Sequence, residues 1–197
     1  MAWTGHPYFR SLTADQLREL EESGIRKTFS RGQTIWVRGQ DVRFAALILK
    51  GFVKMVKSTA MGVNVAMEIF GPGQMFGLVG TLDGKGCPLS AITVNRVEIV
   101  EIPKAKVKEL LLGNLEVMLE VQARTISRFR DANELKAVLL TGSVERRILA
   151  VLANLAESFG VPRDDSVLID VPITRQDLAD MVGSTAETVS RVISNRH

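Results

Sequence analysis

The chain of 197 residues has a single cysteine, Cys87, and two histidines. One cysteine excludes an intramolecular disulfide framework and a zinc site built from Cys-x-x-Cys pairs. The sequence has no run of about 18 uninterrupted apolar residues, and no apolar stretch flanked by basic residues near its start. We therefore expect neither a membrane span nor a signal peptide. No histidine, cysteine or carboxylate cluster has catalytic spacing. We therefore expect a cytoplasmic protein that is not an enzyme and has no metal or cofactor.

The composition is that of an ordinary globular protein, with 46% hydrophobic and 24% charged residues. The formal charge of +3 suggests nucleic acid as a partner, but the basic excess is not spread evenly. Residues 26–108 contain 13 basic and 5 acidic side chains, whereas residues 109–197 contain 10 basic and 13 acidic ones. A nucleic-acid site must therefore be identified by pattern rather than by net charge.

The region between Ile25 and Ile102 consists of short apolar or alternating runs separated by glycines. Turn signals at spacings of about 8 to 12 residues are typical of an antiparallel sandwich or barrel. A short amphipathic helix is predicted before it, from Leu12 to Ser23. The glycine-rich interval 71–90 is expected to form a loop or short helix whose backbone can approach a ligand.

The stretch from Leu115 to about Leu140 has neither glycine nor proline and predicts a helix about twice the usual length. Residues along it recur at alternating spacings of four and three, which is typical of a coiled-coil seam. We expect this seam to be a homodimer interface, although a long core helix within a monomer is the open alternative. The seam residues are Met118, Gln122, Thr125, Phe129, Ala132, Lys136 and Leu139.

Thr141, Gly142 and Ser143 interrupt the helical pattern, and a further helix is predicted from Val144 to Phe159. A turn around RDDS and a short strand candidate, VLIDV, follow. We place a domain boundary near Thr141.

The segment Pro172–Arg196 carries the strongest local signal. Thr174 followed by Asp177 resembles a capping box that opens a helix, and Gly183 suits the left-handed position that closes it. Ser184 followed by Glu187 is expected to open a second helix in the same way. Two short helices joined by about four residues predict a helix-turn-helix.

The second helix is two-faced, with Val189 on the inner side and Glu187, Ser190 and Arg191 on the outer side. An arginine can donate two hydrogen bonds to guanine, and a glutamate can accept one from cytosine. The alternative is that Glu187 caps the helix and pairs with Arg191 as a solvated ion pair. The front of the first helix is expected to contact phosphate, with a plain helix cap as the open alternative. The DNA-binding candidates are Thr174, Arg175, Gln176, Ser184, Thr185, Glu187, Ser190 and Arg191.

With these motifs the chain resembles the CRP/FNR family of bacterial transcription regulators. The likeness rests on the motif ITRQDLADMVGSTAETVSR, on the long helix, and on glycines at positions 32, 39, 51, 73 and 77. It implies an α+β fold: a jelly-roll-like antiparallel β-roll that senses an effector (1–113), a dimerisation helix (114–140) and a winged helix-turn-helix domain (141–197).

The resemblance also implies a homodimeric regulator, either an activator or a repressor, that binds a two-fold operator in double-stranded DNA and contacts RNA polymerase. The E-x-x-S-R pattern that ends at Arg191 looks closer to the fumarate-nitrate branch, which favours TTGAT-like half-sites, than to the cyclic-AMP branch.

The effector pocket implied by the resemblance departs from the cyclic-AMP pattern. Aligning Gly77 and Ser90 with the family places Leu78 where that branch has a glutamate and Leu89 where it has an arginine. Because a buried phosphate would lack its cation, we do not expect tight cyclic AMP binding. The effector is unknown: an apolar or anionic ligand, or none in a protein regulated by abundance. The pocket residues are Gly77, Leu78, Leu89, Ser90, Ala132 and Asn133.

Other sensors of the family also lack their ligands here. An iron–sulfur cluster needs several cysteines, and haem needs an axial ligand, for which the sequence offers His6 and His197 near its two ends. Cys87 is expected to be incidental, with a redox switch as the alternative.

The resemblance leads us to expect a β-hairpin wing after the second helix, but the sequence ends at His197. We therefore expect a truncated domain with weakened DNA binding and a loosely ordered C-terminus. The alternative function is a ligand-binding signalling module that acts through protein partners, in which Arg191→Ala would leave function intact.

Overall fold

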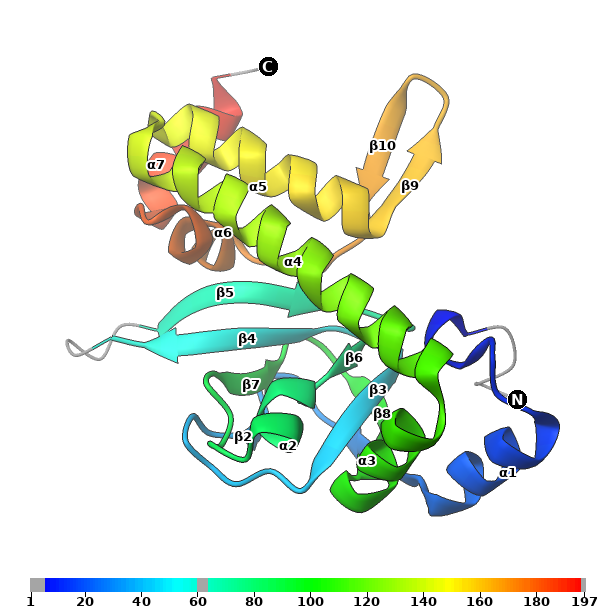
Figure 1. Ribbon diagram of the computed structural model, residues 1–197. Helices are drawn as coiled ribbons and strands as arrows, with labels where there is room; N and C mark the ends of the chain where they lie inside the picture. Colours follow the sequence, from blue (N-terminus) through cyan, green and yellow to red (C-terminus); the bar gives the residue numbers. More distant parts are fainter. Residues whose placement is uncertain (1–5, 60–63, 196–197) are drawn as a thin grey trace. The chain divides into compact units, whose positions relative to one another are not determined.

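The computed structural model describes residues 6–59 and 64–195 (Figure 1). Arg196 and His197, to which the expectation of a loosely ordered C-terminus applies, lie outside the described residues. The chain divides into two compact units. The first contains residues up to Met55 together with Ile69–Arg128, and the second contains Val56–Glu68 together with the residues from Phe129 onward. Within the described residues, no helix is both long and apolar enough to cross a membrane.

The N-terminal half folds into two four-stranded sheets, with strand orders β1-β8-β3-β6 and β2-β7-β4-β5. The pairings of β1 and β3 with β8, of β2 with β7 and of β3 with β6 are antiparallel, which confirms the predicted class of β-domain. Its elements are the 3-10 helix η1 (Pro7–Phe9), α1 (Ala14–Ser23), β1 (Ile25–Phe29), β2 (Thr34–Trp36), β3 (Phe44–Lys50), β4 (Val53–Ser58), β5 (Asn64–Phe70), β6 (Met75–Phe76), α2 (Leu78–Asp83), β7 (Ser90–Thr93), β8 (Val97–Pro103) and α3 (Lys104–Gly113).

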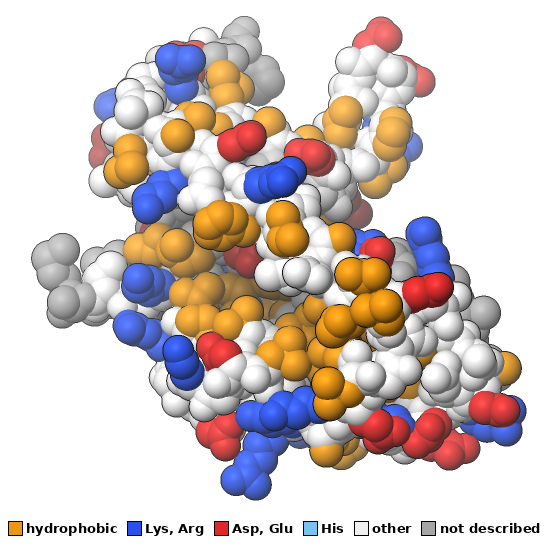
Figure 2. Space-filling view, viewed as in Figure 1, with side chains coloured by type: hydrophobic (Ala, Val, Ile, Leu, Met, Phe, Trp, Pro, Cys, Tyr) orange, Lys and Arg blue, Asp and Glu red, His pale blue; other side chains and the backbone are white. Residues whose placement is uncertain are grey.

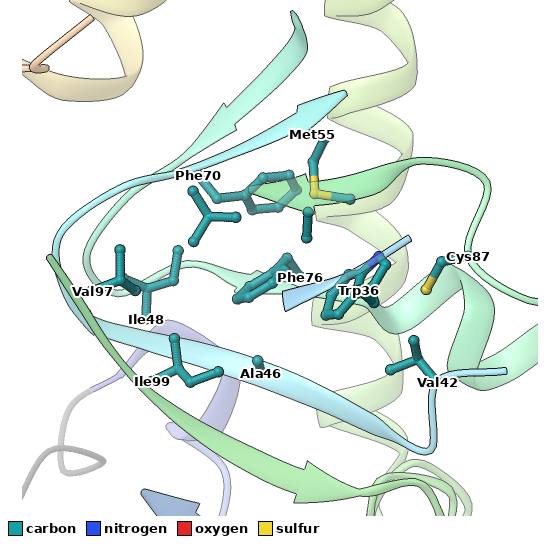
Figure 3. Packing of buried hydrophobic residues seen from close by; sticks show 12 residues of the cluster. Trp36, Val42, Ala46, Ile48, Met55, Phe70, Phe76, Cys87, Val97 and Ile99 are labelled. Atoms are coloured by element: carbon teal, nitrogen blue, oxygen red, sulfur yellow. The ribbon is translucent and has the colours of Figure 1, made fainter. Parts of the chain in front are cut away.

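Strand β3 is buried on both faces, and its side chains alternate between two hydrophobic clusters. Ala46 and Ile48 face a cluster that also contains Trp36 and Phe76 (Figure 3). Ala45 and Leu47 face the other cluster, to which α1, α3 and the start of the long helix α4 contribute side chains. Because successive side chains of a strand point to opposite faces, the run FAALILK satisfies both.

The glycine-rich interval forms β6 and then the short helix α2, as one of the two expected alternatives. Gly77 precedes α2 with φ at 84°, a left-handed conformation that favours glycine. The first helix begins at Ala14, two residues later than predicted, because Thr13 and Gln16 form a capping box.

The remaining elements are helical except for one hairpin. The long helix α4 (Leu115–Thr141) and the next helix α5 (Val144–Phe159) confirm the two predicted helices. The strand candidate VLIDV corresponds to β10 (Ser166–Ile169), which pairs with a strand that the sequence did not predict, β9 (Gly160–Arg163). Helices α6 (Arg175–Val182) and α7 (Ala186–Ser194) complete the second unit.

Candidate nucleic-acid interface and effector region

Helix α6 begins and ends as the sequence predicts. The hydroxyl of Thr174 accepts a hydrogen bond from the Asp177 amide at 3.0 Å, and the Asp177 carboxylate accepts one from the Thr174 amide at 2.9 Å. At the other end Gly183 has φ at 62°, and its amide donates to the carbonyls of Ala179 and Asp180. These contacts close both ends of α6 and fix where the chain turns.

The start of α7 differs from the expectation. Its N-cap is Thr185, whose hydroxyl accepts a hydrogen bond from the Thr188 amide at 3.2 Å, so the prediction of Ser184 and Glu187 as a capping box was wrong. The amide of Ser184 instead donates to the Ala179 carbonyl at 2.9 Å. Ser184 therefore belongs to the closure of α6, and α7 begins one residue later.

Helix α7 has the two faces that were predicted. Val189 is fully buried, Val192 and Ile193 are half-buried, and Glu187 and Arg191 are exposed. Ser190 is half-buried beside them. Within the described part of the chain, Glu187 and Arg191 form no ion pair with each other. Their side chains, one helical turn apart, are thus available to an external partner.

The front of α6 presents polar side chains as well. Thr174, Arg175 and Gln176 are exposed, although the side-chain Nε2 of Gln176 donates to the Asp180 carboxylate at 2.7 Å. Arg175 is the cation among them, and a phosphate contact is the role that such a position suits. That role stays a prediction.

The predicted effector region of the β-domain is apolar where the family pattern has charge. Leu78 packs against the cluster that contains Leu47, and Leu89 packs against the cluster that contains Trp36. The half-buried Ser90 hydroxyl accepts a hydrogen bond from the Arg38 amide at 3.0 Å. The leucine side chains at both anchor positions are therefore half-buried against the hydrophobic clusters, and they offer no polar group to a phosphate.

The Trp36 side chain lies between Gly77 and Leu89, two of the predicted pocket residues. Its indole N–H donates to the Leu89 carbonyl at 3.0 Å, and its ring stacks on Phe76 with centroids 5.0 Å apart (Figure 3). A Cβ built on Gly77 would lie 3.1 Å from the far edge of the indole ring, tighter than an ordinary contact. Of the six predicted pocket residues, the structure thus joins Gly77 and Leu89 through Trp36.

Ala132 and Asn133 are exposed on α4 and belong to the second unit. Their part in an effector pocket stays a prediction.

Helix α4 has one covered stripe and one open stripe. In its first half Val117 is buried, the Arg124 guanidinium lies 4.8 Å from the centre of the Tyr8 ring, and that of Arg128 lies 4.0 Å from the centre of the Phe70 ring. On the opposite side exposed apolar side chains follow the helix (Figure 2), at Leu115, Met118, Leu119, Ile126, Phe129 and Leu140. Of the predicted seam, Met118, Gln122, Thr125, Phe129, Ala132 and Lys136 are exposed, and Leu139 is half-buried.

The lone cysteine and the described histidine are both inside the protein. Burial raises the pKa of the Cys87 thiol to about 11, and the charges of Asp83 and Asp41 add to the effect. Burial lowers the pKa of His6, whose Nε2 donates to the Gly73 carbonyl and whose Nδ1 accepts from the Tyr8 amide. The hydrogen bond to Gly73 opposes that shift, and the charge of Arg124 adds to it. The described residues contain no group of three or more potential metal ligands.

Sequence reasoning missed two residues that the structure connects to these regions. In the sequence Trp36 is one apolar residue of a short apolar run, and Arg147 is one cation of the helix predicted from Val144 to Phe159. The Arg147 guanidinium in fact donates to the Val182 carbonyl at 2.8 Å and to the Gly183 carbonyl at 3.4 Å. Backbone acceptors 35 and 36 residues away leave no trace in the side-chain pattern.

Two family models match the chain. The cyclic nucleotide-binding domain covers residues 26–114, and the Crp-like helix-turn-helix domain covers residues 146–195. Their boundaries agree with the β-sheet elements and with the helices from α5 to α7.

Similar proteins are regulators as well. The cAMP-activated global transcriptional regulator CRP of Haemophilus influenzae is 30% identical over 79% of this chain and 69% of its own length. The global nitrogen regulator of a Nostoc strain is 26% identical over 87% of this chain and 78% of its own length. The solved structure of FixK2 from Bradyrhizobium japonicum has a TM-score of 0.78 at 20% identity, over 88% of this chain and 84% of that one. The chain therefore belongs to the CRP/FNR family of transcription regulators and carries a Crp-like helix-turn-helix DNA-binding domain.

Proposed function

We propose that the chain is a homodimeric, sequence-specific transcription regulator that reads TTGAT-like half-sites in double-stranded DNA through α7. The observation that carries the proposal is the exposed pair Glu187 and Arg191, one helical turn apart on a helix whose opposite face is buried. At this spacing the two side chains can address neighbouring base pairs in the major groove. The hydroxyl of Ser190 lies on the same helix, between them in sequence.

The dimer is supported by the open stripe of α4. Phe129 is 68% exposed, and it shares the stripe with Leu115, Leu119 and Ile126. These positions recur at spacings close to those of a coiled-coil seam, so a second copy of α4 can cover them. Two copies related by a two-fold axis would place two α7 helices on half-sites about one turn of DNA apart.

Cyclic AMP is not part of the proposal, even though the Haemophilus influenzae relative carries it in its name. Leu78 and Leu89 offer no polar group to a ribose or a phosphate, and both pack against hydrophobic clusters. RNA polymerase follows as a partner from the family's role in transcription. We expect the protein to act in the cytoplasm, where it would bind its operator DNA.

The decisive experiment measures binding of the full chain to a duplex with two TTGAT-like half-sites and to a scrambled duplex at the same salt concentration. Arg191→Ala should lose about 1–3 kcal/mol of discrimination at one base pair. Arg163→Ala is the matched control, because Arg163 is an exposed cation of the β9–β10 hairpin.

Equal affinity of the unmodified chain for both duplexes would refute sequence-specific reading. If Arg191→Ala also left regulation in cells intact, a signalling module acting through protein partners would be favoured instead.

The dimer has its own test. Phe129→Glu places a charge in the open stripe and should convert the dimer to a monomer in light scattering at micromolar concentration. Ser127→Glu is the control, since Ser127 is exposed on the same helix but points well away from the stripe at 100° per residue. A dimer that survives Phe129→Glu would place the interface elsewhere.

A further inference from the structure

The turn of the helix-turn-helix is held from outside by one side chain of α5. Arg147 donates from a single guanidinium nitrogen, Nη1, to the carbonyls of Val182 and Gly183. These carbonyls are the last one of α6 and the first one beyond it, and neither has an acceptor role within the helix. The guanidinium therefore sits at the negative end of α6, where a cation is stabilised.

The same contact fixes the start of the reading helix. Gly183 is followed by Ser184 and then by Thr185, the N-cap of α7. Glu187 lies in the first turn of α7. Any change in the orientation of the Gly183 peptide is passed through two residues to the turn that carries Glu187.

Arg147 is not an obvious choice for stability alone. Its Nε is buried, and it has no hydrogen-bond partner among residues 6–59 and 64–195. A buried donor without an acceptor is unfavourable, so its presence in a native structure calls for an explanation. Arg147 also lies close to the N-terminus of α5, the positive end of that helix, where a cation is disfavoured.

We propose that Arg147 is a positioning residue for DNA reading: it locks the turn between α6 and α7 and so sets the angle at which Glu187 and Arg191 are presented. The proposal rests on the proposed function for its consequence in DNA binding, but the lock itself can be measured without DNA. In this role Arg147 does not contact bases, and its effect passes through the backbone of Val182 and Gly183.

The test compares the full-length variants Arg147→Met, Arg147→Lys and Arg146→Met. Methionine keeps the length and apolar character of the Arg147 stem but removes its donors. Lysine keeps the positive charge and can donate a hydrogen bond to one of the two carbonyls. Arg146 is the matched control because it is the neighbouring arginine of α5 and is exposed.

The first readout is amide hydrogen exchange of Gly183 and Ser184, whose amides close α6. Arg147→Met should speed exchange at these two amides roughly tenfold, the factor expected for losing a hydrogen bond to a charged group, while amides in the middle of α5 keep their protection. Arg147→Lys should recover part of the protection, and Arg146→Met should leave it unchanged. Unchanged exchange in Arg147→Met, or a uniform rise over the whole of α5 to α7, would overturn the lock.

The second readout is affinity for the TTGAT-like and scrambled duplexes. Arg147→Met should lower the specific affinity roughly tenfold and leave the affinity for scrambled DNA within about twofold. Equal losses on both duplexes would overturn the positioning role. If the unmodified chain does not distinguish the duplexes, the proposed half-site fails, and the exchange rates of Gly183 and Ser184 still decide whether the lock exists.

Discussion

Replacing Trp36 by phenylalanine is expected to destabilise the β-domain by about 2 to 3 kcal/mol. The side chain is 2% exposed, and its indole N–H is the donor to the Leu89 carbonyl. Phenylalanine retains stacking on Phe76 but leaves this carbonyl without its partner, at a cost of about 1 to 2 kcal/mol for a half-buried acceptor. The smaller ring adds about 1 kcal/mol for the space left beside Gly77.

Thermal unfolding followed by circular dichroism measures this loss. For a chain of this length about 2 to 3 kcal/mol corresponds to a fall in Tm of about 4 to 12 °C. Val37→Ala is the control, because Val37 is the next residue and is 56% exposed, so its truncation should change the stability by less than about 0.5 kcal/mol. A Trp36→Phe variant that melts within about 1 °C of the unmodified protein would refute the argument that the indole holds Leu89.

The same measurement addresses the effector. A ligand present at about a hundred times its Kd stabilises the folded state by about 2.7 kcal/mol. Because Trp36 fills the space between Gly77 and Leu89, and because Leu89 offers no cation, about 1 mM cyclic AMP should leave the Tm of the unmodified protein unchanged. A rise of about 5 °C or more would show that the region opens to admit the nucleotide, contrary to this reasoning.

Three further results are expected. Gly183→Ala should lower the free energy of unfolding by about 1–2 kcal/mol because of the φ of 62°, since a Cβ would lie at an ordinary 3.6 Å from Arg147. Gly113→Ala is the control, because a Cβ there would meet open space and Gly113 has no positive φ. An equal loss in Gly113→Ala would contradict the argument. Burial lowers the pKa of His6 below 6.5, so its contribution to stability is complete above pH 6.5 and is lost as the pH falls toward the lowered value. Melting at about pH 7.5 and 5.5 should therefore show a larger acid loss in the unmodified protein than in His6→Gln, and identical losses would exclude His6 as the cause. Cys87, with its pKa raised to about 11, should resist alkylation in the native protein at neutral pH and react once urea unfolds it, whereas rapid native labelling would restore the redox-switch alternative.

Helix ends were the best predicted features because their signals are local. The capping box at Thr174 and the glycine at position 183 each act within a few residues, and both were confirmed. The N-cap of α7 was predicted one residue early because Ser184 and Thr185 are both residues that commonly cap helices. Which of them caps α7 depends on the end of α6, where the Ser184 amide donates to the Ala179 carbonyl.

Features that depend on distant pairing were not predictable in the same way. β9 contains Gly160 and Pro162, residues typical of turns, and it is a strand only because Pro162 lies opposite Val167 in β10. Proline is tolerated there because a two-stranded hairpin has free edges. The bonds of Trp36 to Leu89 and of Arg147 to Val182 end on backbone carbonyls, which are the same for every residue type.

The charge distribution makes the geometry of the turn more important than it would be in a basic domain. Residues 109–197 carry 10 basic and 13 acidic side chains. One of the basic side chains, Arg147, is bonded to the turn between α6 and α7. Non-specific affinity for duplex DNA comes from phosphates neutralised by lysine and arginine, each contributing about 0.9 to the slope of log affinity against log salt. A region with more acidic than basic side chains is expected to have a shallow slope and little non-specific affinity, so that its binding depends on base contacts. Base contacts from Glu187 and Arg191 require a fixed angle of α7, and a change at Arg147 or Gly183 should therefore lower specific binding before it lowers the salt slope.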